Sequence, residues 1–202
     1  MLGACLADIE RPAVVLGLPR GGVPVAARVA QALKAPLDVI VVGKLGLPGQ
    51  PELAMGAVAG VRGGVETIRN EAVLAQVAIT EEDFARVHRR VVTEVQAREA
   101  SYRGAREMEP LQERVVLVID DGLATGSTMR AAVAAVARQQ PARIVVAVPV
   151  APRDTCVALR AASAVDELVC AWIPQRFLAV GDAYLDFTAT SDEQVRGLLA
   201  GG

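Results

Sequence analysis

Short apolar runs alternate with helical segments along most of the chain. Strands are predicted where valine, isoleucine and leucine run together, over residues 14–18, 38–42, 114–119, 143–148 and 167–171. Helices fit residues 23–34, 128–139 and 153–162. Continuously apolar strands separated by helices are typical of an α/β fold, with a parallel sheet covered by helices on both faces. Ligands of such sheets bind beyond the carboxyl ends of the strands.

The stretch between the second and third strands has a different pattern. Residues 43–64 are rich in glycine and proline, which predicts a loop, with a hairpin turning at Gly63 and Gly64. Asn70 is a candidate cap for a short helix, and Thr80 opens a long helix in capping-box style. His88, the single histidine, is expected to be solvated on the charged face of this long helix.

The composition excludes several classes of protein. Of the 202 residues, 52% are hydrophobic and 22% are charged, which is typical of a soluble globular chain and not of a disordered one. The net charge of −2 predicts no attraction to nucleic acid or to an anionic membrane. The longest apolar stretch, residues 144–151, is too short to cross a bilayer. Three widely spaced cysteines form neither a disulfide framework nor a zinc pattern, and they fit a reducing cytoplasm.

The most informative stretch joins the third strand to the next helix. There the apolar strand runs into two adjacent acids, Asp120 and Asp121, which are followed by a turn of small and hydroxyl-bearing residues up to Thr128. Glycine lets the backbone approach a ligand closely, and the free N–H groups at a helix start suit a phosphate. Two acids at a strand end can accept hydrogen bonds from a sugar diol. The pattern therefore favours a sugar phosphate as the ligand.

Other site types fit this stretch poorly. A Walker A loop needs a lysine between Gly126 and Ser127, and the Gly-x-Gly-x-x-Gly fingerprint of dinucleotide folds is absent there. A single histidine makes histidine triads and histidine-rich metal sites poor hypotheses. A purely structural acidic turn is disfavoured, because two carboxylates at the end of a buried strand are costly without partners.

The strand, the two acids and the Thr-Gly-Ser-Thr turn resemble the phosphoribosyl pyrophosphate (PRPP) motif of type I phosphoribosyltransferases. Residues 18–24 resemble the pyrophosphate loop of this family, and residues 44–46, 56–58 and 146–152 resemble a subgroup of bacterial stand-alone phosphoribosyltransferase-domain proteins. The resemblance implies a single domain over residues 1–202. Its core would be residues 12–42 and 114–171, with a loop and helical insertion over 43–113 and a small hood over 172–199.

The resemblance also implies a role for each matching residue. Asp120 and Asp121 would hold the ribose hydroxyls and, through water, a Mg²⁺ ion. The PRPP-binding turn would comprise these acids and Gly122, Leu123, Ala124, Thr125, Gly126, Ser127 and Thr128, with the last four on the 5-phosphate.

A second group would bind the pyrophosphate. Arg20 would act by its charge, Gly21 and Gly22 through backbone N–H groups, and Lys44 would reach the diphosphate. Many family members have Arg-Lys where this chain has Gly43 and Lys44, so one cation is missing. Arg20 and Lys44 join the two acids as the catalytic candidates.

The implied reaction is a magnesium-dependent transfer of the 5-phosphoribosyl group of PRPP to a base, which is expected to be a nucleobase. Pyrophosphate is released. Departing pyrophosphate needs cations and N–H groups, while no nucleophilic side chain is required. The stretch from Gly46 to Gly64 is the candidate mobile cover that excludes water. Such a protein would work in the cytoplasm, in nucleotide metabolism, with PRPP, pyrophosphate and a nucleobase or nucleoside monophosphate as ligands. Neither nucleic acid nor membrane is an expected partner, and a homodimer is left open.

The acceptor base stays open. Trp172 and Phe177 are candidate base contacts in the hood, where Phe177 either stacks on a base or belongs to a small apolar hood core. The tail from Phe177 resembles hypoxanthine-type enzymes, whereas Ala124 resembles adenine-type loops. A non-catalytic regulator that senses PRPP or nucleotides is an alternative, and hydrolysis or phosphate transfer on another ribose phosphate is a third. Retention of Arg20, Lys44 and both acids favours catalysis.

Overall fold

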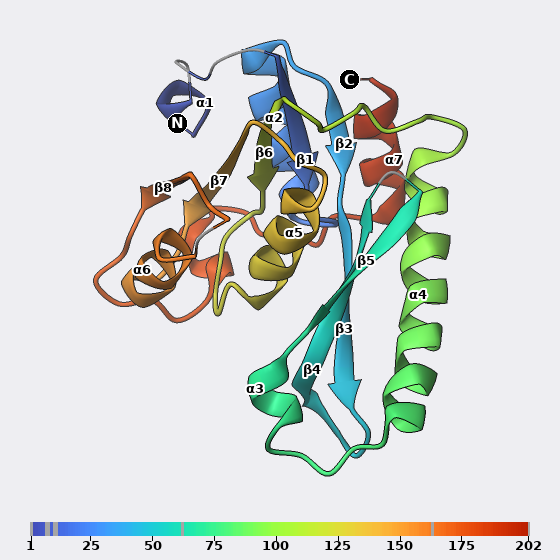
Figure 1. Ribbon diagram of the computed structural model, residues 1–202. Coiled ribbons are helices and arrows are strands. Elements are labelled where there is room, and N and C mark those ends of the chain that lie inside the picture. Colours follow the sequence, from blue (N-terminus) through green and yellow to red (C-terminus); the bar gives the residue numbers. More distant parts are fainter. Residues whose placement is uncertain (1, 7–8, 10–11, 62, 163, 202) are drawn as a thin grey trace.

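Five parallel strands form the central sheet, in the order β2-β1-β6-β7-β8 (Figure 1). The computed structural model describes residues 2–6, 9, 12–61, 63–162 and 164–201. The strands are β1 (Ala13–Gly17), β2 (Leu37–Val39), β6 (Val115–Ile119), β7 (Arg143–Val150) and β8 (Glu167–Trp172). The predicted parallel α/β sheet is therefore confirmed.

Each face of this sheet is covered by its own set of helices. Odd-numbered strand residues such as Val15 and Leu117 pack with α1 (Leu2–Cys5), α2 (Gly22–Leu33) and α7 (Asp192–Ala200). Even-numbered residues such as Leu16 and Val118 pack with α5 (Ser127–Ala137) and α6 (Arg153–Arg160). Successive side chains point to opposite faces of a strand, so continuously apolar strands require both faces to be covered.

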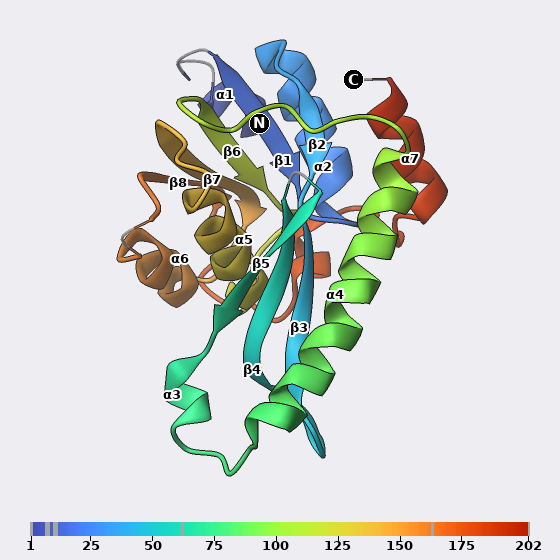
Figure 2. The same cartoon turned by 45° about the vertical axis from the view of Figure 1, so that its right-hand side comes forward.

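A second, antiparallel sheet lies beside the first. It consists of β3 (Val41–Leu47), β4 (Gln50–Val61) and β5 (Gly64–Arg69), and α3 (Glu71–Leu74) leads from it to the long helix α4 (Glu81–Arg103). We call residues 41–103 the arm. Figures 1 and 2 show that the arm extends past the carboxyl ends of the parallel strands, with α4 lying along one face of its sheet.

The prediction of a loop over residues 43–64 was wrong, because this stretch forms most of β3, all of β4 and the first residue of β5. Its glycines serve close packing. A Cβ at Gly43 would lie 2.5 Å from Val91 of α4, and one at Gly60 would lie 2.7 Å from the Glu99 carboxylate. Gly49, at a φ of 81°, forms the tight turn between β3 and β4. The expected hairpin is confirmed, but with its turn earlier than predicted: Gly63 lies in the turn, and Gly64, which pairs with Val61, is the first residue of β5.

The predicted strand over residues 38–42 also differs from the structure. The parallel strand β2 ends at Val39, and the arm begins with β3 at Val41. A buried ion-pair network holds this crossing point. Arg103, at the end of α4, donates to Asp38 Oδ1 at 3.0 Å and to Glu99 Oε1 at 2.6 Å. All three side chains are at most 8% exposed, and removing one partner of such a buried pair typically costs about 3–5 kcal/mol.

His88 is partly buried, so the expectation that it is solvated was wrong. Its Nε2 lies 2.7 Å from Thr67 Oγ1 on β5, and its ring stacks on that of Phe84. The charged neighbours of His88 in the sequence hid this contact, which forms because β5 packs against α4. The helix caps predicted at Asn70 and Thr80 are present, with side chains that accept from Val73 N and Asp83 N.

Candidate functional site

Two turns meet at the carboxyl ends of β1 and β6. These neighbouring strands pair in register, with Gly17 opposite Ile119, so the turns that follow them start side by side. The Leu18 N–H donates to the Ile119 carbonyl at 2.9 Å, which ties the first turn to the end of β6. The structure thus brings the predicted pyrophosphate loop and the predicted PRPP turn together.

Glycine is required where the two turns touch. A Cβ at Gly22 would lie 2.8 Å from both Asp120 Cα and the Ile119 carbonyl oxygen. A Cβ at Gly21 would overlap the Asp121 carboxylate. The added Cβ atoms at Gly22 and Gly21 would both be closer to their neighbours than any ordinary contact. The backbone of the first turn therefore lies directly against the two acids.

Arg20 directly precedes the two glycines of the first turn. Its side chain is exposed, and the peptide bond that links it to Pro19 is cis. Within the described ranges, Arg20 has no ion-pair partner. Its guanidinium is therefore available to an anionic ligand.

The two acids have no basic partner among the described residues. Burial, and next the charge of Asp121, raise the pKa of Asp120 to about 8. Burial likewise raises the pKa of Asp121. Over the part of the chain that the structure describes, no basic side chain forms an ion pair with either acid. Such a pair of carboxylates binds a proton or a cation readily, because either one offsets the repulsion between them.

These acids fit a magnesium ion that keeps most of its own shell. The described residues contain no group of three or more histidine, cysteine, aspartate or glutamate side chains that could hold a metal. Mg²⁺ is commonly bound by one or two carboxylates, with waters and substrate phosphates filling the other positions. Asp120 and Asp121 supply that donor set.

The turn after the acids has the form of a phosphate cradle. The side chains of Thr125, Ser127 and Thr128 are exposed, and Thr125 Oγ1 lies 3.1 Å from Ser127 Oγ. Gly126 adopts a φ of 70°, which non-glycine residues rarely take, and it is the N-cap residue directly before the 11-residue helix α5. Exposed hydroxyls and free N–H groups at this helix start can together bind a phosphate.

Two residues that support the turn were not predicted. Thr155, in α6, donates its hydroxyl to the carbonyl of Ala124 at 2.6 Å. Tyr184 donates its hydroxyl to the carbonyl of Asp121 at 2.5 Å. Each joins segments far apart in the sequence, and no local motif marks either residue. A hydroxyl residue in the first turn of a helix after a sheet strand is the one available signal for Thr155.

The candidate base contacts lie beside the site but apart from each other. A pocket of about 500 Å³ opens where β7 and β8 end, and its lining consists of Pro152, Arg153, Asp154, Ile173, Pro174, Gln175 and Phe177. Phe177 is half-buried there. Trp172 ends β8, is 49% exposed and does not line this pocket.

Lys44 is placed on the arm. Neighbouring Gly43 faces α4, so the alternation of the strand puts Lys44 on the opposite face of the arm sheet. Its ammonium group donates to the Glu52 carbonyl at 2.5 Å and lies 3.4 Å from the Glu52 carboxylate. Lys44 is thus paired within the arm rather than with the two acids.

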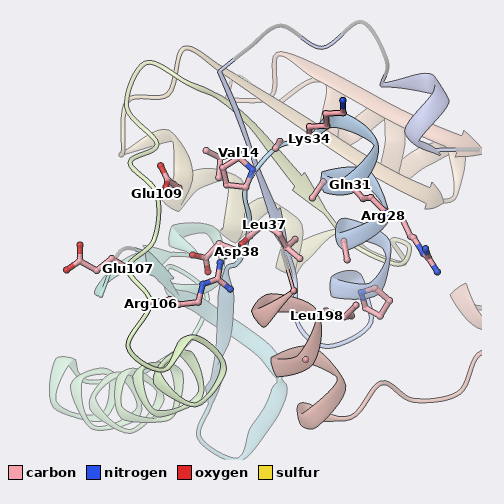
Figure 3. A pocket seen from close by; sticks show the side chains of 17 residues that line it. Val14, Arg28, Gln31, Lys34, Leu37, Asp38, Arg106, Glu107, Glu109 and Leu198 are labelled. Carbon is pink, nitrogen blue, oxygen red and sulfur yellow. Dashed lines mark hydrogen bonds between the residues drawn. The ribbon is translucent and has the colours of Figure 1, made fainter.

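A separate groove of about 1030 Å³ runs beside α2 and α7. Figure 3 shows Arg28 and Gln31 of α2 and Lys34, which follows that helix, on one side of it, and Glu107 and Glu109 on the other. None of the predicted site residues lines this groove. None of the helices in the described part of the chain is long and apolar enough to cross a membrane.

Comparisons with known proteins agree with this geometry. The family described as "Phosphoribosyl transferase domain" matches residues 6–177. The Mycobacterium tuberculosis proteins MT0597 and Rv0571c, which carry the provisional name phosphoribosyl transferase, are each 44% identical over 188 residues. These alignments cover 92% of this chain and 41% of each relative, so the chain spans about two fifths of the length of these curated relatives.

One solved structure is similar over nearly the whole chain. The crystal structure of TT1426 from Thermus thermophilus is 40% identical and superposes with a TM-score of 0.83. The match covers 98% of this chain and 94% of TT1426.

Proposed function

Since the chain belongs to the family of phosphoribosyl transferase domains, we propose that it is a magnesium-dependent phosphoribosyltransferase. It transfers the 5-phosphoribosyl group of PRPP to a base and releases pyrophosphate. The observation that carries this proposal is the junction of the two turns. Gly21 and Gly22 pack against Asp120 and Asp121, so ribose-binding acids and a pyrophosphate-binding backbone lie next to each other.

Each part of PRPP is bound by its own set of residues. Asp120 and Asp121 accept hydrogen bonds from the ribose hydroxyls, and residues 125–128 bind the 5-phosphate through hydroxyls and N–H groups. Arg20 and the N–H groups of the first turn bind the pyrophosphate and stabilise the charge that it gains as it leaves. A magnesium ion, when bound, supplies further neutralisation of the diphosphate. No side chain acts as a nucleophile, because the base itself attacks the sugar carbon.

Isothermal titration with PRPP, with and without Mg²⁺, tests the first part of this proposal. We expect binding that strengthens with Mg²⁺, because no basic side chain among the described residues pairs with the two acids and a cation offsets their repulsion. A screen of nucleobases for pyrophosphate release tests the second part. Absence of PRPP binding under both conditions would contradict the proposal, whereas binding with no pyrophosphate release from any base would favour a PRPP-sensing regulator.

Replacing Arg20 with alanine should weaken the binding of pyrophosphate more than that of a nucleoside 5′-monophosphate. The guanidinium belongs to the first turn, while the monophosphate uses residues 125–128. Loss of a charge-assisted hydrogen bond corresponds to about 1.5–3 kcal/mol, or roughly ten- to a hundredfold in affinity. Titrations of both ligands against both proteins measure the difference, and equal losses would make Arg20 a structural residue.

Replacing Phe177 with alanine should reduce the contribution of the base to binding. Phe177 lines the pocket beyond β7 and β8, and stacking on an aromatic ring contributes about 1–3 kcal/mol per base. Fluorescence of Trp172, the single tryptophan, reports titrations with a nucleoside monophosphate and with ribose 5-phosphate. Affinity for ribose 5-phosphate should stay nearly unchanged. If both affinities fall equally, Phe177 stabilises the fold and the base binds elsewhere.

A further inference from the structure

One tyrosine of the hood forms a hydrogen bond with the main chain of the acidic turn. Tyr184 follows a short 3-10 helix (Val180–Ala183) in the segment after β8, and its hydroxyl donates to the main-chain carbonyl of Asp121 at 2.5 Å. Burial, and then the charges of Asp121 and Asp120, raise its pKa to about 12. The hydroxyl therefore keeps its proton at any physiological pH and acts as a permanent donor.

Packing holds this tyrosine and its neighbours in one arrangement. A Cβ at Gly122 would lie 2.6 Å from Val180 Cγ1, so the 3-10 helix touches the backbone of the acidic turn. The Tyr184 ring lies 5.1 Å from that of Phe187, and Phe187 leaves no room for a side chain at Gly181. The hydrogen bond is thus one part of a fitted contact between hood and turn.

The carbonyl that Tyr184 contacts belongs to a peptide group with a second role. The same peptide carries the N–H of Gly122, and this backbone group acts to lower the pKa of the Asp121 carboxyl. One rigid peptide, whose carbonyl belongs to the ribose-binding acid Asp121 itself, is therefore held at its oxygen by the hood. Movement of the hood must therefore rotate this peptide or break its hydrogen bond with Tyr184.

We propose that Tyr184 is a positioning residue, which fixes the Asp121–Gly122 peptide and thereby couples the position of the hood to the orientation of the Asp121 carboxylate. This inference rests on the proposed function, because the carboxylate matters to binding only if it holds the ribose. A base contact by the hood then favours ribose binding by the turn, and the reverse holds equally, since such coupling is reciprocal.

The test compares two phenylalanine variants. Tyr184→Phe removes the hydroxyl and keeps the ring. Tyr102→Phe is the matched control, because Tyr102 also donates a buried hydroxyl, to Asp192 Oδ1 at 2.6 Å, and also has a pKa raised to about 12. The control bond joins α4 to α7 and does not touch the acidic turn.

We expect Tyr184→Phe to weaken Mg²⁺–PRPP binding about three- to tenfold, the range of one net hydrogen bond. It should also shrink the ratio of affinities between adenosine or inosine 5′-monophosphate and ribose 5-phosphate, since the hood no longer aligns the turn. Tyr102→Phe should leave both quantities within twofold of the wild type. The two variants should have similar melting temperatures. A residue that only stabilised the fold would lower the melting temperature without changing that ratio.

Amide hydrogen exchange of the unliganded protein separates this inference from the proposed function. Tyr184→Phe should speed exchange at Gly122, and Tyr102→Phe should not, whether or not the protein binds PRPP. If the protein does not bind PRPP, the proposed function is wrong. Faster exchange at Gly122 in Tyr184→Phe would still support the contact between the hood and the turn. Unchanged exchange at Gly122 would overturn the positioning role, as would unchanged PRPP affinity in a protein that binds PRPP.

Discussion

An Asp120→Asn variant should bind Mg²⁺–PRPP roughly ten- to a hundredfold more weakly than the wild type, the equivalent of about 1.5–3 kcal/mol of charge-assisted hydrogen bonding. Asparagine has the shape of the acid but offers one acceptor where the carboxylate offers two, and it carries no charge to attract the metal. Calorimetric titration measures the affinity. Unchanged PRPP affinity would mean that Asp120 does not hold the ribose.

The same variant should unfold at a higher temperature than the wild type above neutral pH. The pKa of Asp120 rises from its usual 3.8 to about 8 in the folded protein, so the folded state holds a proton that the unfolded state has lost. Stability therefore falls as the pH rises from about 4 to 8, and this fall should be missing in Asp120→Asn. Asparagine keeps the acceptor for the Asp121 N–H, which donates to Asp120 Oδ1 at 2.9 Å in the wild type. Melting temperatures between pH 5 and 9 are the measurement, and parallel pH profiles for the two proteins would contradict the assignment.

Replacing Gly22 with alanine should cost both stability and binding. The new Cβ would lie 2.8 Å from two backbone atoms, Asp120 Cα and the Ile119 carbonyl oxygen, and neither can rotate away. The first turn must therefore shift from the acids. We expect a loss of about 1–3 kcal/mol in the free energy of unfolding, as for other overpacked sites. Affinity for pyrophosphate and PRPP should fall more than tenfold, because the shift separates the two turns.

Gly197→Ala is the control for this glycine substitution. Gly197 lies in α7, where no atom comes within 4 Å of an added Cβ, so alanine should stabilise the helix by about 0.5–1 kcal/mol. Chemical denaturation and PRPP titration of both variants make the comparison. Wild-type PRPP affinity in Gly22→Ala would show that the contact between the two turns does not matter for binding.

The parallel sheet and the acidic turn were predictable because their signals are local. A strand buried on both faces must be apolar at every position, and the acids must follow it directly to reach the sheet edge. Asp120 and its turn therefore lie where the pattern indicates, as does the glycine pair of the first turn.

The arm was not predictable in the same way, because the meaning of its glycines depends on a distant partner. Gly43 and Gly60 look like loop residues in the sequence, yet they are strand positions against which α4 packs closely. The roles of Tyr184 and Thr155 were not predictable for a related reason. Their hydroxyls donate to main-chain carbonyls in another segment. Every residue type has such a carbonyl, so the sequence does not show which residue is the acceptor.

The ends of the arm lie side by side. The Arg103 guanidinium, where α4 ends, donates to the carbonyl of Val39 at 3.2 Å, just before β3 begins. The chain thus departs from the core and rejoins it at nearly one point, so the intervening segment behaves as a cassette. Its length and tip can change, by duplication, deletion or replacement with the segment of a relative, without altering the strand order and connections of the parallel sheet. Such an exchange must keep the contacts between arm and core, among them the three charges at the crossing, the bond from Tyr102 to Asp192, and the packing of β4 on α5.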